Sequence, residues 1–245
     1  MIKKIEILAI IPARGGSKSI PYKNITPLGG KPLLSYALAV IKQSQQVNRL
    51  IVDTDDEKIT AVAKSLGAEA PYRRPAELAT DTTPTMPVLR HSLEWLEKNE
   101  NYKPDYVLLV QATSPFIKTS EIDAALDLIK KNPQADSVTS VIEVPNQFHP
   151  INLRQITESG YLEFVNPEER AKYNTRQSKP KRYAIGNLWV FTPSVIKNKD
   201  IPIGDRCLPL VIKNGLSVFD VDTQEDLEVA EALLPMVLRN RLSYS

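Results

Sequence analysis

Short apolar runs alternate with segments of helical periodicity along residues 1–145, and this alternation restricts the fold more than any other feature. The apolar runs are rich in aliphatic and β-branched residues, which is typical of strands buried on both faces of a parallel sheet. The predicted strands are 5–11, 50–52, 106–110 and 137–144. The predicted helices lie within 32–41, 53–67, 84–98 and 122–129. This order predicts an α/β fold with a mostly parallel, Rossmann-like sheet and helices on both faces.

The pattern changes after residue 145. Alternating residues flank a turn at 159–160 and predict a β-hairpin, and a polar, basic stretch follows as far as Arg182. We therefore interpret 145–182 as an inserted arm of a single domain that spans 1–245. The remaining predicted elements are strands at 183–191 and 216–221 and a helix at 224–238.

Composition argues against several classes of protein. The 245 residues include 31 Lys and Arg against 29 Asp and Glu, a net charge of +2, so we expect no binding to nucleic acid or to a membrane through an overall positive field. One cysteine and two histidines cannot form a disulfide framework or a Cys/His zinc site. Glu6 and Arg14 interrupt the apolar start, which we interpret as a strand and not as a signal peptide. We expect a cytoplasmic protein.

The loop after the first predicted strand combines glycine with positive charge. Gly15 and Gly16 let backbone N–H groups approach a ligand, and Arg14, Lys18 and Lys23 supply cations, which suits phosphate oxygens. The position favours this reading, because ligands of open parallel sheets bind beyond the carboxyl ends of the strands. A solvated basic turn is the alternative. The GxxxxGK[ST] and GxGxxG patterns are absent, which argues against the usual P-loop and dinucleotide sites.

Two aspartates near the other end of the chain form a candidate metal site. In FDVDTQEDL, Asp220 and Asp222 lie on one side of an extended segment, since side chains of a strand repeat every two residues. Two carboxylates there can hold Mg²⁺, and the alternative is a strand end followed by a helix cap. A cationic loop and a carboxylate pair together indicate a nucleoside triphosphate bound with its metal.

Five segments, in order along most of the chain, carry a family resemblance. They are LAIIPARGGSKSIPYKN, RRPAELATDTTPT, LLVQATSP, TRQSKPKRY and FDVDTQEDL. Together they resemble the CMP-sialic acid synthetases, or acylneuraminate cytidylyltransferases, which implies a fold like that of the type A nucleotidyltransferases. The resemblance implies an enzyme that moves CMP from CTP to the anomeric hydroxyl of a nonulosonic acid and releases pyrophosphate, with Mg²⁺ as cofactor. It also implies a homodimer in which 145–182 is the dimerisation arm.

The resemblance further implies roles for residues on the nucleotide side. Lys23 and Arg14 would be the catalytic cations that neutralise the triphosphate, with Lys23 as the principal one in the transition state. Beside Gly15 and Gly16 of the glycine loop, the residues implied for nucleotide binding are Asn24, Arg74, Thr83 and Thr85. For Arg74 the alternative is an ordinary exposed loop charge.

On the sugar side, Gln111 would hydrogen-bond the acceptor, and Arg176 would pair with its carboxylate as a bidentate guanidinium. For Arg176 the alternative is a solvated basic patch. Asp220 and Asp222 match the metal carboxylates of the family, so the resemblance agrees with the assignment made from their spacing.

Departures from the family pattern lie mainly on the sugar side. Asn152 stands where many sialate enzymes carry lysine, Ser178 where they often carry aspartate, and Gly186-Asn187 where Asn-Gly is familiar. Legionaminic and pseudaminic acids are therefore alternatives to N-acetylneuraminate. Ser19 replaces a common glycine in the first loop, which alters backbone freedom without removing a charge.

Three other functions remain alternatives at this point. One is a cytidylyltransferase for a shorter 3-deoxy acid such as Kdo. A second is a catalytically silent nucleotide-binding regulator, against which the presence of Arg14, Lys23, Asp220 and Asp222 together argues. A third is a nucleic-acid-binding module, which the near-neutral net charge disfavours.

Overall fold

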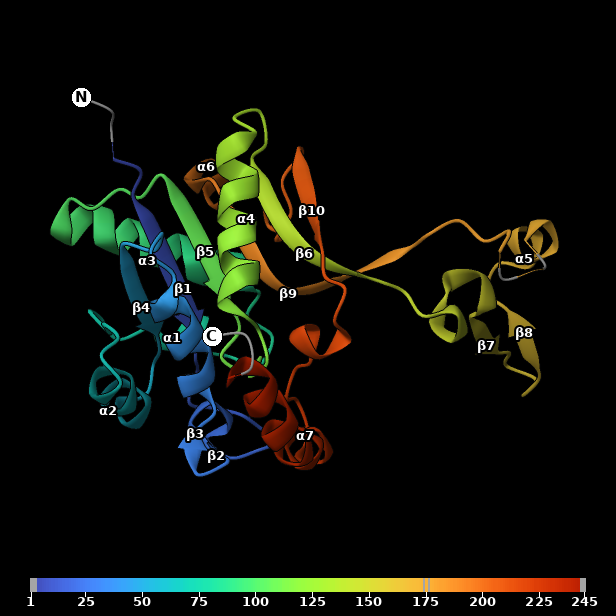
Figure 1. The fold of residues 1–245 in the computed structure, drawn as a ribbon, viewed down its shortest axis with the longest axis horizontal. Helices are drawn as coiled ribbons and strands as arrows, with labels where there is room; N and C mark the ends of the chain where they lie inside the picture. Colours follow the sequence, from blue (N-terminus) through green and yellow to red (C-terminus); the bar gives the residue numbers. More distant parts are fainter. Residues whose placement is uncertain (1–3, 174, 176, 243–245) are drawn as a thin grey trace.

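One sheet of six strands organises the molecule (Figure 1). The structure is a computed structural model that describes residues 4–173, 175 and 177–242. Across the sheet the strand order is β10-β6-β9-β5-β1-β4. Their bounds are β1 Ile7–Pro12, β4 Arg49–Asp53, β5 Tyr106–Val110, β6 Ser137–Glu143, β9 Tyr183–Phe191 and β10 Cys207–Val211.

The sheet is mostly parallel, as the alternation predicted. Strand β1 pairs in parallel with β4 and β5, and β6 pairs in parallel with β10. Strand β9 runs antiparallel between β5 and β6, and its ladder with β6 shifts register between Thr139 and Val141. Ser140 lies at this shift, and its hydroxyl accepts hydrogen bonds from the backbone N–H groups of Asn187 and Leu188, both at 3.1 Å.

Helices cover both faces of the sheet, so this part of the prediction is confirmed. One face carries α1 (Leu34–Gln43), α2 (Glu57–Ser65) and α4 (Thr119–Lys131), and the other carries α3 (Thr85–Glu100) and α6 (Pro193–Asn198). Strand β1 contributes to both cores: residues 7, 9 and 11 face the first set of helices, and residues 8 and 10 face the second. Burial on both faces explains why its sequence is continuously apolar. In the part of the chain that the structure describes, no helix has the length and apolar character needed to cross a bilayer.

The C-terminal part differs from the prediction. Residues 216–221 were predicted as a strand, but the chain there forms a 3₁₀ helix, η5 (Gly215–Val218), followed by irregular backbone. The side chain of Asn214 accepts a hydrogen bond from the N–H of Leu216 at 3.0 Å and so starts a turn in place of a strand. Strand β10 forms the sheet edge instead. Pro209 lacks a backbone N–H, and an edge strand tolerates this because it has a neighbouring strand on one side only.

The long loop after β1 also holds more structure than predicted. It contains η1 (Lys23–Ile25) and a two-residue ladder between β2 (Pro27–Leu28) and β3 (Lys31–Pro32). Pro32 therefore lies in this ladder and not in the first turn of α1, which begins at Leu34. Helix α7 (Gln224–Leu242) packs against the loop through a third apolar cluster and so brings the segment that precedes it near the end of β1.

The inserted segment forms a lobe beyond the ends of β6 and β9 (Figure 1). The predicted hairpin is present as β7 (Arg154–Ile156) and β8 (Leu162–Phe164), and Gly160 in its turn has a φ of +81°. Around it lie η3 (Asn146–Phe148), η4 (Pro150–Asn152) and α5 (Pro167–Lys172). Below, "the arm" means residues 145–182.

Candidate active site

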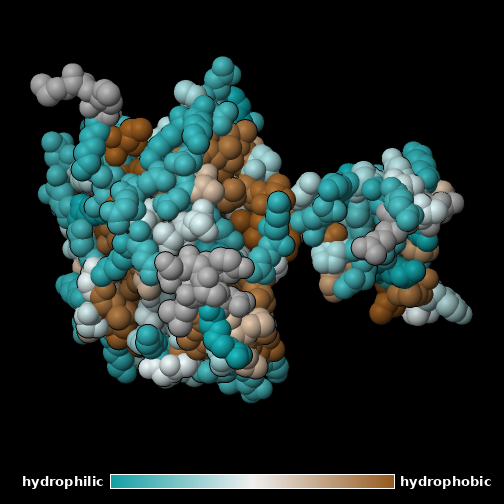
Figure 2. Space-filling model, in the orientation of Figure 1, coloured by the Kyte–Doolittle hydropathy of each residue, from teal (hydrophilic) through white to brown (hydrophobic). Residues whose placement is uncertain are grey.

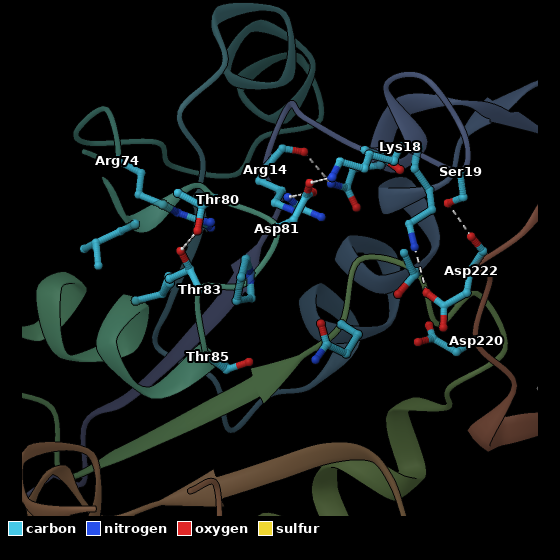
Figure 3. Close-up of a pocket in the computed structure, with 18 residues that line it drawn as sticks. Arg14, Lys18, Ser19, Arg74, Thr80, Asp81, Thr83, Thr85, Asp220 and Asp222 are labelled. Carbon is cyan, nitrogen blue, oxygen red and sulfur yellow. Dashed lines mark hydrogen bonds and ion pairs between the residues drawn. The ribbon is translucent and has the colours of Figure 1, made fainter. Parts of the chain in front are cut away.

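A pocket of about 660 Å³ opens beyond the carboxyl ends of β1, β4 and β5 (Figure 3). This is the edge at which ligands bind in open α/β sheets. The predicted site residues that line it are Arg14, Lys23, Asn24, Arg74, Thr83, Thr85, Gln111, Asp220 and Asp222. Figure 3 shows Arg74 at one end, Arg14 in the middle, and Asp220 and Asp222 at the other end. We call the two ends the base end and the phosphate end.

The middle of the pocket holds two cations that share one carboxylate. Arg14, two residues beyond β1, forms an ion pair with Oδ1 of Asp81, and Lys18 pairs with Oδ2 of the same residue at 2.6 Å. Hydrogen bonds from Lys18 and Arg14 hold the pKa of the Asp81 carboxyl below its usual range. Asp81 therefore stays ionised, and its carboxylate is the counter-ion of both Arg14 and Lys18.

The phosphate end combines Lys23 with the aspartate pair. Nζ of Lys23 lies 2.8 Å from Oδ1 of Asp222, and the Lys23 side chain is only 16% exposed. The hydroxyl of Ser19 donates to the carbonyl oxygen of Asp222, which ties the glycine loop to the segment before α7. Buried Asn24 donates through Nδ2 to the carbonyl oxygen of Arg14 at 2.9 Å and so fixes the loop from inside.

Asp220 has the electrostatic environment of a metal ligand. Burial raises the pKa of its carboxyl, a hydrogen bond from Thr113 opposes that rise, and the nearby charge of Asp222 adds to it. The Ser114 hydroxyl lies 3.3 Å from Oδ1 of Asp220. Proteins bind Mg²⁺ through one or two carboxylates together with substrate phosphates. The two neighbouring carboxylates of Asp220 and Asp222, of which Asp220 is buried, fit this ion. The described residues hold no cluster of three or more His, Cys, Asp or Glu side chains suited to a metal.

The base end is built around Arg74, which is not the exposed loop charge considered as its alternative. Arg74 is 5% exposed, and its guanidinium forms an ion pair with Asp53, the last residue of β4. Along the chain it lies between α2 and η2 (Ala76–Leu78), and a loop from 79 to 84 leads on to α3. In that loop the hydroxyls of Thr80 and Thr83 lie 2.6 Å apart, and Thr85 is the first residue of α3.

Two predicted site residues, Gly15 and Gly16, do not line the pocket, and a third, Arg176, cannot be placed. The N–H of Gly15 donates to Oδ1 of Asp55 at 3.0 Å, and a Cβ at Gly15 would lie 2.8 Å from the Cβ of Asp56, so Gly15 permits a close approach to this turn. Neither Gly15 nor Gly16 is among the lining residues. Arg176 lies outside the residues that the structure describes.

Sequence reasoning did not identify Asp53 and Asp81, although both pair with predicted site residues. A signal for Asp53 was present, because an acidic residue directly after a buried apolar strand needs a partner at that sheet edge. Asp81 gave no such sign, since it lies in a polar loop where acidic residues are ordinary.

Comparison with known proteins finds relatives along nearly the whole chain. The cytidylyltransferase family model matches residues 8–240. The CMP-N,N′-diacetyllegionaminic acid synthase of Legionella pneumophila is 33% identical over 224 residues, which cover 91% of this chain and 93% of the relative. The pseudaminic acid cytidylyltransferase of Campylobacter jejuni is 29% identical over 219 residues, which cover 89% of this chain and 92% of the relative.

A solved structure agrees on the fold. The CMP:2-keto-3-deoxy-manno-octonic acid synthetase complexed with CTP superimposes with a TM-score of 0.69 at 18% identity, and the match covers 94% of this chain and 99% of that one. At this identity the likeness supports the α/β fold alone. The family match over 8–240 and the relatives of similar length confirm the prediction from the sequence: this chain belongs to the cytidylyltransferase family of CTP-dependent enzymes.

Proposed function

We propose that this enzyme transfers CMP from CTP to the anomeric hydroxyl of a nonulosonic acid. The hydroxyl oxygen attacks the α-phosphorus and gives up its proton to solvent, the bond from that phosphorus to the bridging oxygen breaks, and pyrophosphate leaves with the electron pair of that bond. The single observation that carries the proposal is one pocket that holds a buried guanidinium at one end, cations in the middle and an aspartate pair at the other end. This order matches base, triphosphate and metal.

Lys23 and Arg14 are the proposed catalytic cations. Charge on the triphosphate shifts toward the leaving pyrophosphate in the transition state, and fixed cations aimed at that charge lower the barrier. Lys23 is the better placed of the two, because it is half-buried and adjoins the aspartate pair. Asn24 fixes the loop that carries both, and a role for Gly15 and Gly16 in phosphate binding stays a prediction.

The proposed metal ligands are Asp220 and Asp222. Cytidylyltransferases generally use a divalent metal, and Mg²⁺ is the ion that suits two carboxylates and phosphate oxygens. Such an ion polarises phosphoryl oxygens and neutralises developing charge. Asp222 pairs with Lys23 in this structure, so the two would separate when the carboxylate turns to a metal.

Several observations support a nonulosonic acid as the acceptor. Both relatives above are named for such acids, and Gln111, at the end of β5, lies in the pocket wall where it can hydrogen-bond a sugar. Nζ of Lys179 lies 2.9 Å from Oδ1 of Asn152, so the arm holds an ammonium group beside the position where sialate enzymes often carry lysine. The proposed carboxylate contact from Arg176 stays a prediction. The alternative acceptor is a shorter 3-deoxy acid such as Kdo.

We also propose that the arm makes the enzyme a homodimer. It exposes large apolar side chains that a monomer would leave in water: Ile156 and Tyr161 are each 75% exposed, and Leu162 is 67% exposed. Figure 2 shows apolar groups on the arm and on the side of the body that faces it. Apolar patches of this kind mark protein–protein contacts.

The reaction consumes CTP, which the cytoplasm supplies, so we place the enzyme there.

The test is pyrophosphate release with CTP, Mg²⁺ and a panel of acceptors. We expect release with N,N′-diacetyllegionaminate, pseudaminate or N-acetylneuraminate and none with Kdo or without acceptor. Release with Kdo alone would support the shorter acid, and no release with any acceptor would refute the proposal.

For the arm, sedimentation of Ile156→Glu should give a monomer where the unmodified enzyme gives a dimer.

A further inference from the structure

A buried polar cluster lies directly behind the base end of the pocket. At its centre is Asp53, which is fully buried at the carboxyl end of β4. Oδ1 of Asp53 binds Nε of Arg74, and the Asp53 carbonyl oxygen accepts from Nη2 of Arg74 at 2.7 Å. Oδ2 lies 2.7 Å from the hydroxyl of Tyr72 and 2.7 Å from that of Ser92 on α3. Two other segments of the chain, residues 72–74 and α3, thus converge on this one carboxylate at the end of β4.

Asp53 has no surface toward the pocket. Its two carboxylate oxygens are occupied by protein donors, and neither Asp53 nor Tyr72 nor Ser92 is among the residues that line the cavity. Arg74 does line it, and Figure 3 shows its guanidinium directed toward Thr80. Any effect of Asp53 on a ligand must therefore pass through Arg74.

The hydroxyl that holds Oδ2 is fixed and stays protonated. Burial raises the pKa of Tyr72 far above its ordinary value, and the charge of Asp53 raises it further. The Tyr72 ring packs edge-on against His91 with centroids 5.1 Å apart and against Trp95 at 4.9 Å. Since Tyr72 remains a neutral donor with little freedom to move, the orientation of the Asp53 carboxylate is determined as well.

A buried ion pair is a poor means of stabilising a fold, because desolvation of two charges offsets their attraction. What this pair does provide is a guanidinium held in one orientation by two contacts, one to Oδ1 and one to the backbone carbonyl oxygen of Asp53. We infer that Asp53 is a positioning residue that fixes Arg74 for recognition of the nucleotide base, with Tyr72 and Ser92 holding the Asp53 carboxylate in turn. The inference rests on the proposed function, in which Arg74 contacts the base of CTP.

A fixed guanidinium can select cytosine over uracil. A guanidinium only donates hydrogen bonds, and N3 of cytosine is an acceptor whereas N3 of uracil carries a proton. A donor held at this edge of the base gains a bond with cytosine and meets another donor with uracil. A guanidinium free to turn away loses this distinction, because it can reach the carbonyl O2 that both bases share.

The experiment measures the dissociation constants of CTP and UTP with Mg²⁺ by calorimetry, on the full chain and without acceptor. Asp53→Asn keeps the shape and removes the charge, and we expect CTP to bind roughly tenfold more weakly and the CTP/UTP preference to fall by a similar factor. Tyr72→Phe keeps the packing and removes one bond to Oδ2, and we expect a shift of about threefold in the same direction. Glu69→Gln is the control, since it removes a carboxylate partner of Arg49 at the opposite end of β4.

The outcomes separate the inference from the proposed function. If CTP releases no pyrophosphate with any acceptor, the proposed function fails and the inference fails with it. If CTP does react but the unmodified enzyme binds CTP and UTP equally, the inference alone fails. If a preference for CTP exists and Asp53→Asn and Tyr72→Phe leave it intact, Asp53 has no positioning role and the proposed function stands. Arg74→Ala decides the route: in that background Asp53→Asn should cause no further loss of selectivity, and an additive loss would contradict action through Arg74.

Discussion

The two ends of the pocket hold their positive charges in opposite ways. At the base end, Arg74 is 5% exposed and its carboxylate partner is fully buried behind the cavity wall. In the middle and at the phosphate end, the partners of the cations are themselves part of the wall: the Asp81 side chain is 35% exposed and that of Asp222 is 69% exposed. The first ion pair lies outside the ligand's path, and the others lie in it.

This difference suits the two ends of the pocket to different tasks: the base end to recognition of the ligand and the phosphate end to the reaction. Arg74 can keep its partner when a ligand arrives, so its geometry is the same before and after binding. In the proposed function, Arg14, Lys18 and Lys23 would exchange Asp81 and Asp222 for phosphate oxygens, because carboxylate and phosphate compete for the same donors. We therefore expect the base end to be preorganised and the phosphate end to become competent only when the nucleotide and the proposed metal replace internal ion pairs.

The largest expected effect comes from Lys23→Ala. A cation aimed at charge that develops on the leaving group acts mainly in the transition state, so kcat should fall by about 10²–10³-fold while the dissociation constant of CTP changes little. Steady-state kinetics and CTP binding measure the two. Lys31→Ala, an exposed lysine on β3, is the control and should retain wild-type kcat. A weaker affinity for CTP with unchanged kcat would make Lys23 a ground-state binding residue.

The next effect concerns the metal. Asp222→Asn removes one of two anionic ligands, and the Mg²⁺ concentration for half-maximal activity should rise by at least the roughly 10–100-fold that loss of a partner around a metal site causes. Activity titrated with Mg²⁺ measures this. Asp205→Asn breaks a similar aspartate–lysine pair outside the pocket, with Lys199, and should leave the titration unchanged. An unchanged curve for Asp222→Asn would leave Asp222 as a partner of Lys23 only.

A smaller effect, of opposite sign, is expected from Asp81→Asn. If Asp81 competes with the triphosphate for Arg14 and Lys18, its neutral variant should bind CTP about threefold more tightly, as expected for loss of exposed ion pairs. Glu97→Gln is a matched control, because Glu97 also bridges two cations, Lys103 and Lys197, away from the pocket. Weaker binding by Asp81→Asn would show that the carboxylate orders the cations and does not compete with the ligand.

Much of the sheet could be predicted, because buried strands carry their signal in consecutive residues. The strands predicted at 106–110 and 183–191 coincide with β5 and β9. Strand β10 was missed, since Pro209 interrupts its apolar pattern and only its place at a sheet edge makes that tolerable. The strand predicted at 216–221 was wrong because the N–H of Leu216 donates a hydrogen bond to the side chain of Asn214, and the turn that this bond starts outweighs the apolar run.

The site was predictable as a set of residues and not as a set of ion pairs. Lys23 and Asp222 are separated by 199 positions and Arg14 and Asp81 by 67, so no local pattern links them. The carboxylate partner of a cation can lie in the pocket wall or behind it. Which of the two occurs depends on how β4, α3 and the loop between them pack. That the twelve predicted residues perform the roles given to them stays a prediction.

The smallest expected effect is on stability and comes from Asp220. Burial raises the pKa of its carboxyl, so the folded protein holds this proton more tightly than the unfolded chain does. Stability from this group is therefore full below the unfolded pKa and is lost as pH rises through the raised folded pKa. Asp220→Asn removes that loss, and without Mg²⁺ at neutral pH it should raise the melting temperature by about a few degrees.

The same variant should be less active, because the buried charge that lowers stability is the charge proposed to hold the metal. Thermal melts from acid to neutral pH measure the stability effect, and the gain in the variant should vanish below the pKa of an unfolded aspartate. Mg²⁺ with CTP should raise the melting temperature of the unmodified enzyme more than that of the variant. An unchanged or lower melting temperature for Asp220→Asn at neutral pH would mean that Ser114 and Thr113 compensate the buried charge fully, and the phosphate end would then be as preorganised as the base end.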